Sequence, residues 1–173
     1  MELIHIDIIG PFPIGLKGQR YIQTFIDDYT RSIWIYPIKF KSNAIDTLYK
    51  FQKMIYNQLG YNIQRIRADN AGEYQSNEWK AFIKEKGIIM EFTAPYSPQQ
   101  NGIAKRFNRT LLERLIAVIT AKNIPKFLWP YIAKSVAYIK NRTYSKTIDK
   151  TPYEALLQSK PNISNIRILG SLV

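Results

Sequence analysis

The sequence predicts an α/β domain with a mixed five-stranded sheet, in which three antiparallel strands come first, and helices on both faces. Three runs rich in β-branched and aromatic residues open the chain, with only a short turn between the second and the third. Strand and helix patterns then alternate, which is typical of parallel strands joined by crossover helices. The 173 residues suffice for one domain with a full core.

Each predicted strand has a local reason. The first, with the sequence ELIHIDII, alternates between two faces, and the second and third flank a hairpin turn at residues 28–31. The remaining two are short apolar runs between helical patterns. In chain order, strands are predicted over residues 2–9, 21–27, 33–38, 63–68 and 88–92.

The helices are predicted from apolar spacing and from their end signals. Ser42 is expected to cap a first helix whose apolar residues recur at spacings of three and four up to residue 59. Ser76 or Asn77 is expected to cap a second helix, which Gly87 ends. Helical patterns then cover residues 101–121 and 127–141, and a short one follows Pro152.

Charge and composition narrow the class of partner. The chain has a net charge of +12 and no cysteine, which excludes a disulfide framework and a thiolate zinc finger. Residues 101–173 carry 13 Lys and Arg against three Asp and Glu. A solvated surface is the ordinary explanation, and an anionic membrane surface is a weaker one, because no helix pairs a basic face with an apolar, Trp-bearing face. We expect this half to face nucleic acid.

Two carboxylates stand out. Asp7 lies at the centre of the first predicted strand, where a carboxylate needs a partner or a metal unless it faces solvent on an edge strand. Asp69 follows the fourth strand, where ordinary turn chemistry also explains it. Together they could hold divalent metal for phosphoryl chemistry. His5 shares the Asp7 face and is expected to be a satisfied core histidine or a partner of that site.

Five separated strings resemble the integrase catalytic core of copia-type retrotransposons. They are HIDIIGPF, FIDDYTR, RADNAGEY, TAPYSPQQNGIAKRFNRTL and TPYEALLQSKPNISNIRILG, and they cover nearly the whole chain in the family's order. The resemblance implies an RNase H-like fold and a polynucleotidyl transferase that cleaves and joins DNA with Mg²⁺ or Mn²⁺. It also implies a catalytic site of two Asp and one Glu, with 35 residues between the second Asp and the Glu.

The resemblance assigns Asp7 and Asp69 to the two family aspartates, both as catalytic residues and as metal ligands. The family's Glu position falls on Lys105, which as an ammonium has no lone pair for a metal. We therefore expect weakened metal binding and impaired catalysis, and we expect Lys105 to pair with Asp7 or Asp69. Ala71 replaces a family Gly and would strain its loop if that position needs a positive φ.

The resemblance also places nucleic-acid contacts at the start of the helix that carries Lys105. The predicted contact residues are Gln99, Gln100, Asn101, Lys105, Arg106 and Arg109. Their amides, ammonium and guanidinium groups suit phosphates and base edges. The same helix is expected to bury a stripe that includes Leu111, Leu115 and Ile116.

The expected organisation is a catalytic core over residues 1–160 and a truncated C-terminal extension over 161–173. We expect DNA as the partner, namely retrotransposon ends and target DNA, or RNA, with no membrane, an intracellular location in nucleus or cytoplasm, and a homo-oligomer by family resemblance. The family's N-terminal His/Cys zinc module is expected to be absent. Two alternatives stay open: a non-catalytic nucleic-acid-binding module, and a relic fragment that keeps the RNase H-like fold.

Overall fold

The structure, a computed structural model, describes residues 1–93 and 101–169. It contains one sheet with the strand order β3-β2-β1-β4-β5, so β1 lies at the centre. The first three strands pair antiparallel, whereas β1 pairs with β4 and β4 with β5 in parallel. The predicted mixed sheet is therefore confirmed. The strands are β1 Leu3–Ile9, β2 Tyr21–Asp27, β3 Ile33–Ile38, β4 Arg65–Ala68 and β5 Ile89–Phe92.

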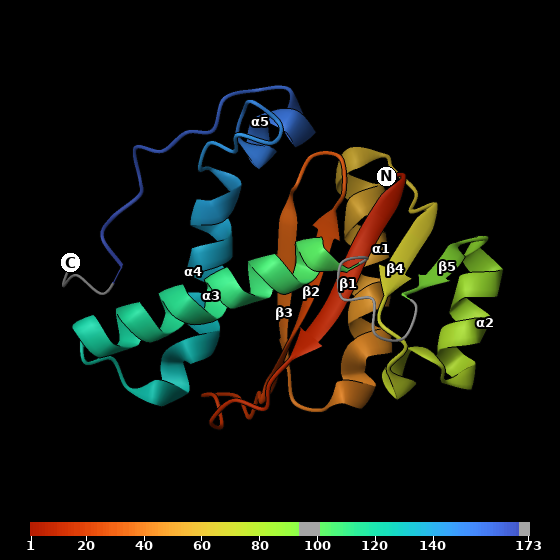
Figure 1. The fold of residues 1–173 in the computed structure, drawn as a ribbon, viewed down its shortest axis with the longest axis horizontal. Coiled ribbons are helices and arrows are strands. Elements are labelled where there is room, and N and C mark those ends of the chain that lie inside the picture. Colours follow the sequence, from red (N-terminus) through yellow and green to blue (C-terminus); the bar gives the residue numbers. More distant parts are fainter. Residues whose placement is uncertain (94–100, 170–173) are drawn as a thin grey trace.

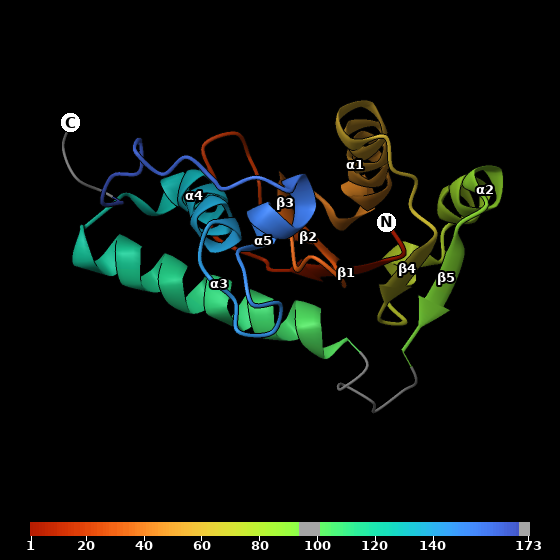
Figure 2. The same cartoon turned by 90° about the horizontal axis from the view of Figure 1, so that it is seen from above.

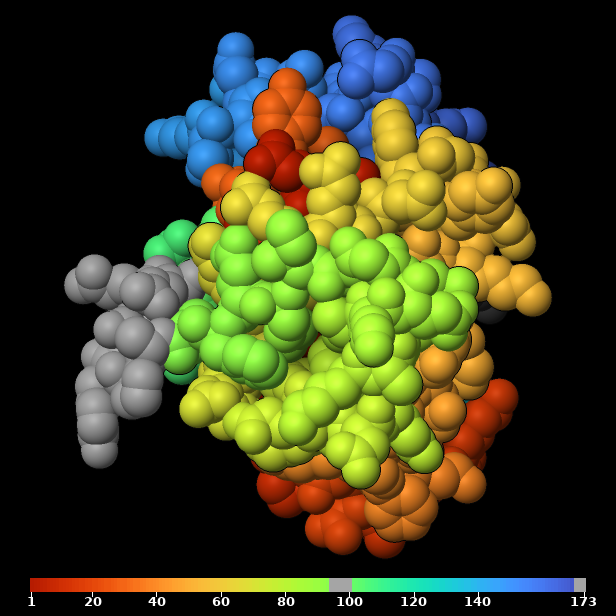
Figure 3. All heavy atoms as spheres, turned by 90° about the vertical axis from the view of Figure 1, so that its right-hand side faces the viewer, coloured from red at the N-terminus to blue at the C-terminus, as the bar shows by residue number. Residues whose placement is uncertain are grey.

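Helices cover both faces of the sheet, as predicted (Figures 1 and 2). Helices α1 and α2 pack on the face that carries Ile4, Ile6 and Phe25. Helices α3 and α4 pack on the opposite face, against Ile22 and Ile33 of β2 and β3. Figure 3 looks onto the β5 edge of the molecule and shows that α2 and β5 form the surface there. The helices are α1 Ala44–Leu59, α2 Asn77–Lys86, α3 Gly102–Ala121, α4 Trp129–Asn141 and α5 Pro152–Leu157.

Local capping explains where the helices begin and end. The Ser76 hydroxyl accepts a hydrogen bond from the Trp79 backbone N–H at 3.1 Å, and Gly87 closes α2 with a φ of 62°. The predicted cap Ser42 is wrong, because residues Lys41–Asn43 form a separate 3₁₀ turn and α1 begins at Ala44. The boundaries of α1 therefore depend on a turn that apolar spacing does not reveal.

Helix α3 crosses the sheet with a narrower buried stripe than predicted. Leu111 and Leu115 are buried, but Ile116 is 61% exposed. Asn141 at the end of α4 brackets Ile33 of β3, accepting from its N–H at 2.9 Å and donating to its carbonyl at 2.8 Å. This contact ties α4 to the outer edge of the sheet.

The C-terminal end of the described chain adds no regular structure after α5. Residues 161–169 form neither helix nor strand, although Leu169 packs against the core of α3 and α4. The predicted boundary at residue 160 stays a prediction. None of the helices within residues 1–93 and 101–169 combines the length and the apolar character needed to span a bilayer.

Candidate metal centre and nucleic-acid face

Two carboxylates lie side by side at the centre of the sheet. Asp7 is on β1, and Asp69 directly follows Ala68, the last residue of the parallel neighbour β4. The register pairs His5 with Arg67, so continuing it by two residues brings Asp7 opposite Asp69. Asp7 is 9% exposed and belongs to a central strand. This excludes the alternative of a solvent-facing Asp on an edge strand.

The environment of Asp7 favours its neutral form in the absence of a cation. Burial raises its pKa, and the charge of Asp69 raises it further, to about 6. Two hydrogen bonds act in the opposite direction: the Ile8 backbone N–H donates to Oδ1 and the Asn108 amide donates to Oδ2, each at 2.9 Å. The charge of Asp69 therefore acts on the buried Asp7 carboxyl across a short distance.

Asn108 is a site residue that the sequence did not single out. It is 3% exposed and reaches Asp7 from the second turn of α3. Asn101, at the start of the same helix, donates to the Ile6 backbone carbonyl at 3.2 Å. Asn101, Lys105 and Asn108 are spaced by four and three residues, which places them on one face of a helix. That polar spacing was the available signal, and it fixes α3 over β1.

Tyr74 is a second buried group near the pair. It is 1% exposed, and its hydroxyl has no hydrogen-bond partner among the described residues. Burial raises its pKa well above the ordinary value, and the charges of Asp7 and Asp69 add to the effect. Ala71, three residues before Tyr74, has φ −75° and ψ 146°, so the predicted strain at that position is absent. Ordinary extended backbone accepts Ala there without cost.

Lys105 occupies the first turn of α3 but does not bond either carboxylate. Its side chain is exposed, and within residues 1–93 and 101–169 it forms no ion pair with Asp7 or Asp69. The predicted direct pairing is therefore wrong. Its positive charge still lowers the pKa of Asp7, as the smallest of the five contributions to that pKa. Lys105 thus faces the site at longer range, through its charge.

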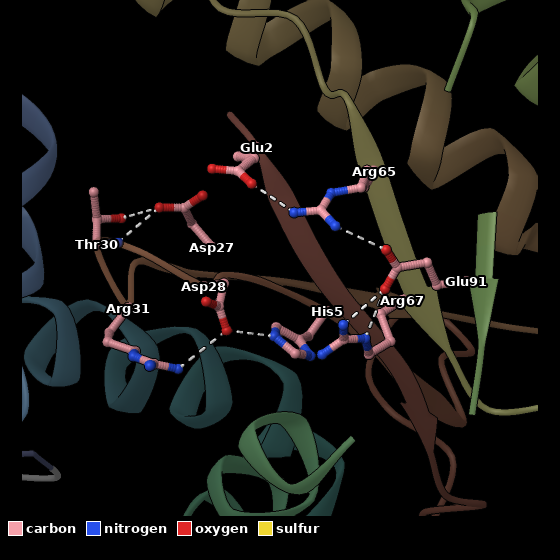
Figure 4. A network of polar contacts seen from close by, with 9 residues as sticks. All are labelled: Glu2, His5, Asp27, Asp28, Thr30, Arg31, Arg65, Arg67 and Glu91. Atoms are coloured by element: carbon pink, nitrogen blue, oxygen red, sulfur yellow. Dashed lines mark hydrogen bonds and ion pairs between the residues drawn. The ribbon is translucent and has the colours of Figure 1, made fainter. Parts of the chain in front are cut away.

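No other acid of residues 1–93 and 101–169 joins Asp7 and Asp69 in a metal-holding group. Glu91 on β5 receives hydrogen bonds from Arg67 at 2.7 and 2.9 Å and from Arg65 at 3.1 Å (Figure 4). The Arg67 hydrogen bond holds the pKa of Glu91 below its usual value. Glu73 pairs with Lys41 at 3.2 Å.

Together these contacts leave the site with two ligands. In the described chain no group of three His, Cys, Asp or Glu side chains is arranged to hold a metal. Residues 94–100 and 170–173 contain none of these residue types.

Two carboxylates still suit one divalent ion. Asp69 Oδ1 is buried without a hydrogen-bond partner among the described residues, and a buried unpaired oxygen of this kind is what a hard cation would satisfy. Asp7 and Asp69 are the residues that would hold the ion. Carboxylate oxygens are the type of ligand that suits Mg²⁺ or Mn²⁺. The site lacks the third carboxylate that the resemblance implies.

The predicted nucleic-acid contact residues do not lie on one surface. Lys105 and Arg109 are exposed on α3, with Arg109 Nε 4.0 Å from Glu113. Arg106 is also exposed but lines a cavity on a different side of the helix. Asn101 is 1% exposed and bonds the sheet, so its amide does not reach a solvent-side ligand, in contrast to the prediction. Gln99 and Gln100 lie outside the described residues.

His5 is a buried histidine whose partner is Asp28. It is 1% exposed, and its Nε2 lies 2.8 Å from Asp28 Oδ1 (Figure 4). Of the two expectations for His5, the satisfied core histidine fits this contact, although Nδ1 has no partner among the described residues.

Comparison with known proteins identifies the family. Residues 1–98 match the model of the integrase core domain. The chain therefore belongs to the integrase core domain family, and the predicted resemblance to a retrotransposon integrase catalytic core is confirmed.

Two retrotransposon polyproteins are similar in sequence to almost the full length of this chain. The retrovirus-related Pol polyprotein from transposon TNT 1-94 of Nicotiana tabacum is 31% identical over 172 residues, which is 98% of this chain and 13% of the polyprotein. The corresponding polyprotein from transposon RE2 of Arabidopsis thaliana is 27% identical over 171 residues, 98% of this chain and 12% of the polyprotein. The chain thus spans about an eighth of the relatives that it matches.

Solved structures confirm the RNase H-like fold. One is the magnesium complex of the HTLV-2 integrase catalytic core, in a trimeric form, which has a TM-score of 0.67 and 16% identity and is matched over 95% of its chain and 90% of this one. Another is the simian T-cell lymphotropic virus intasome with a regulatory subunit of PP2A, with a TM-score of 0.72 and 18% identity over 99% of this chain and 65% of that one.

Proposed function

We propose that this chain is the catalytic core of a copia-type retrotransposon integrase that binds DNA but does not carry out strand transfer. One observation carries the proposal: Asp7 and Asp69 adjoin, whereas the first turn of α3 presents Lys105 where the resemblance requires Glu. The family membership supports the core assignment. The magnesium in the HTLV-2 core and the intasome assembly of the simian virus protein support Mg²⁺ or Mn²⁺, DNA and self-association as properties to test here.

The residues of the chain itself account for both the retained and the lost parts of the chemistry. The Ile8 N–H and the Asn108 amide hold the Asp7 carboxylate in place, and the unpaired Asp69 oxygen adjoins it. A bound divalent ion would act there as a Lewis acid on a phosphate oxygen. Lys105 offers no ligand and opposes the ion's charge.

The strength of the repulsion between Lys105 and a bound divalent ion decides how far metal binding is weakened. Two unit charges 4 Å apart interact by about 4 kcal/mol at an effective dielectric of 20, and a divalent ion doubles this. Lys105 is exposed and can turn toward water, so the true penalty is smaller. Even about 1.4 kcal/mol weakens binding tenfold, on top of the missing ligand.

A second function has its own support. Residues 101–173 keep 13 Lys and Arg against three acids, a charge that suits a non-catalytic nucleic-acid-binding module or a relic with residual DNA affinity. In that case the fold and the basic surface remain useful, or simply persist, without chemistry.

The test is Mn²⁺-dependent nicking and strand transfer by the chain and by Lys105→Glu. Supercoiled plasmid reports nicking without knowledge of the element's ends, and a duplex with the ends of the encoding element reports strand transfer. Lys122→Glu, an equal charge change at the exposed far end of α3, is the matched control. Asp7→Asn, alone and combined with Lys105→Glu, checks that any activity uses this site.

We expect activity in Lys105→Glu and in neither the unchanged chain nor Lys122→Glu. Activity in the unchanged chain that Asp7→Asn abolishes would refute the impairment. Inactivity of all variants, with DNA binding intact, would favour the non-catalytic module. Inactivity without DNA binding would favour the relic.

A further inference from the structure

A basic cavity lies beside α3, away from the two carboxylates. It has a volume of about 240 Å³, room for roughly eight waters by their share of liquid volume. Three cations and three hydroxyls line it, and no acidic residue of the described chain does so. These residues are Arg31, Arg106, Lys140, Thr110, Ser145 and Thr147. We call this feature the basic cavity.

Four separate segments build the basic cavity. They are the β2–β3 turn, α3, the end of α4 and the loop between α4 and α5. Their positions are fixed by specific contacts. Asp27 accepts hydrogen bonds from the Thr30 N–H and hydroxyl at 2.8 and 2.7 Å, and Ser32 donates to the Pro152 carbonyl at 3.1 Å. The walls are therefore held by contacts within the fold.

The cations of the basic cavity have little negative charge beside them. Arg31, held at φ 60° in its turn, has an ion pair at 3.5 Å with Asp28, whose same oxygen also lies 2.8 Å from His5 (Figure 4). Its Nε is buried without an acceptor among the described residues. Arg106 and Lys140 form no ion pair with any residue of the described ranges. Three cationic side chains that line one cavity, with Asp28 as their single ion-pair partner among the described residues, suit an oxyanion.

The position of the basic cavity relative to Asp7 indicates which oxyanion. Ile103, Arg106, Phe107 and Thr110 line the cavity at spacings of three, one and three, whereas Asn101 and Asn108 contact β1 from the other side of α3. At 100° per residue these two sets lie nearly opposite each other around the helix. A helix with side chains is about 10–12 Å across, which corresponds to about three nucleotide steps along the axis of a DNA duplex, at about 3.4 Å of rise per step.

We propose that the basic cavity binds a backbone phosphate of DNA, about three nucleotides from the phosphodiester that faces Asp7 and Asp69. This deepens the proposed function and rests on it for the identity of the polymer. The three cations neutralise the phosphate, and the hydroxyls of Ser145 and Thr147 donate to its oxygens. The strand crosses α3 between the two places.

The test measures the salt dependence of DNA affinity by fluorescence anisotropy. A labelled 20-base-pair duplex is titrated with the chain in EDTA, so that no metal contributes. Lys140→Gln removes one cavity charge, and Lys134→Gln, exposed on the same helix and outside the cavity, is the matched control. Arg106→Gln is a second cavity variant. Thermal melting confirms that each variant folds.

One lost phosphate contact reduces the slope of log affinity against log salt by about 0.9, which is about an eightfold loss at 0.1 M salt. We expect this change in Lys140→Gln and Arg106→Gln and no change in Lys134→Gln. Equal slopes in all variants, with tight DNA binding by the unchanged chain, would overturn the assignment of the basic cavity as a phosphate site. The proposed function would then still stand. No DNA binding by the unchanged chain would overturn both.

Calorimetry with inorganic phosphate distinguishes the source of the anion. Phosphate binding that Lys140→Gln abolishes, together with unchanged DNA affinity, would mean a site for free phosphate and would overturn the assignment to DNA. Weakened DNA affinity with no measurable binding of inorganic phosphate supports a site that holds phosphate as part of the polymer.

Discussion

Asp7→Asn should stabilise the metal-free protein at neutral pH, because it removes a carboxylate whose ionisation the fold disfavours. Burial and then the charge of Asp69 raise the pKa of Asp7 from its ordinary value of 3.8 to about 6. A difference of about 2 pH units corresponds to about 3 kcal/mol at 1.36 kcal/mol per unit. The new amide has partners at hand: the Ile8 N–H still has an acceptor, and the Asn108 amide can turn its unpartnered oxygen toward it.

The sign follows from the two pKa values. Below pH 3.8 Asp7 is protonated in both states, so it costs the fold nothing. As the pH rises from 3.8 to 6, the unfolded chain loses the proton while the folded chain keeps it, and stability falls. Above pH 6 the cost is complete. Asp7→Asn should therefore gain about 3 kcal/mol at pH 7.5 and less than about 1 kcal/mol at pH 4.

Urea denaturation followed by tryptophan fluorescence measures this difference. With a slope of about 1–3 kcal/mol per molar urea, the midpoint should rise by about 1–3 M at pH 7.5. The measurement at pH 4 is the internal control. An equal gain at both pH values would refute the electrostatic reasoning and leave only a packing effect. A loss of stability at pH 7.5 would show that Asp7 is stabilised as an anion without metal.

Three further substitutions test one contact at this centre and two contacts elsewhere in the fold. Asn108→Ala removes a donor to a buried carboxylate, which should cost about 1–3 kcal/mol at pH 7.5 and raise the pKa of Asp7, as read by urea denaturation and carboxyl NMR titration. Asn141→Ala removes the hydrogen bonds to both backbone groups of Ile33, so the amide hydrogen of Ile33 should exchange faster. An unchanged exchange rate would show that Asn141 does not hold α4 to β3. Gly10→Ala places a Cβ 2.6 Å from the Arg20 carbonyl at a φ of 131°. It should cost at least about 1–3 kcal/mol, and an unchanged melting temperature would contradict the strain.

The sequence predicts the sheet well because its strands carry their own signals. The ranges of β2 and β3 agree with the prediction to the residue, since each is an aromatic and β-branched run between turn residues. Ser76 and Gly87 likewise mark the ends of α2 with local chemistry. Ser42 fails as a cap because a 3₁₀ turn competes for the same residues. Turn residues and capping side chains therefore predict the strands and helix ends that they flank. Where two local structures compete for the same residues, as at Ser42, packing decides between them.

The site is less predictable because it is assembled by tertiary contacts. Asp7 and Asp69 could be found from strand position and motif, but the hydrogen bond from Asn108 depends on how α3 lies over β1. The burial of Asn101 reverses its expected role for the same reason. The basic cavity draws on four segments, so no single motif could reveal it.

The central claim is that Lys105 deprives an otherwise intact pair of carboxylates of its metal. Isothermal titration of Mn²⁺ into the chain, Lys105→Glu and Lys122→Glu at pH 7.5 tests it most directly. We expect Lys105→Glu to bind Mn²⁺ at least tenfold more tightly than the unchanged chain, a gain of about 1.4 kcal/mol, and Lys122→Glu to match the unchanged chain. Equal Mn²⁺ affinity in the chain and Lys105→Glu would contradict the claim.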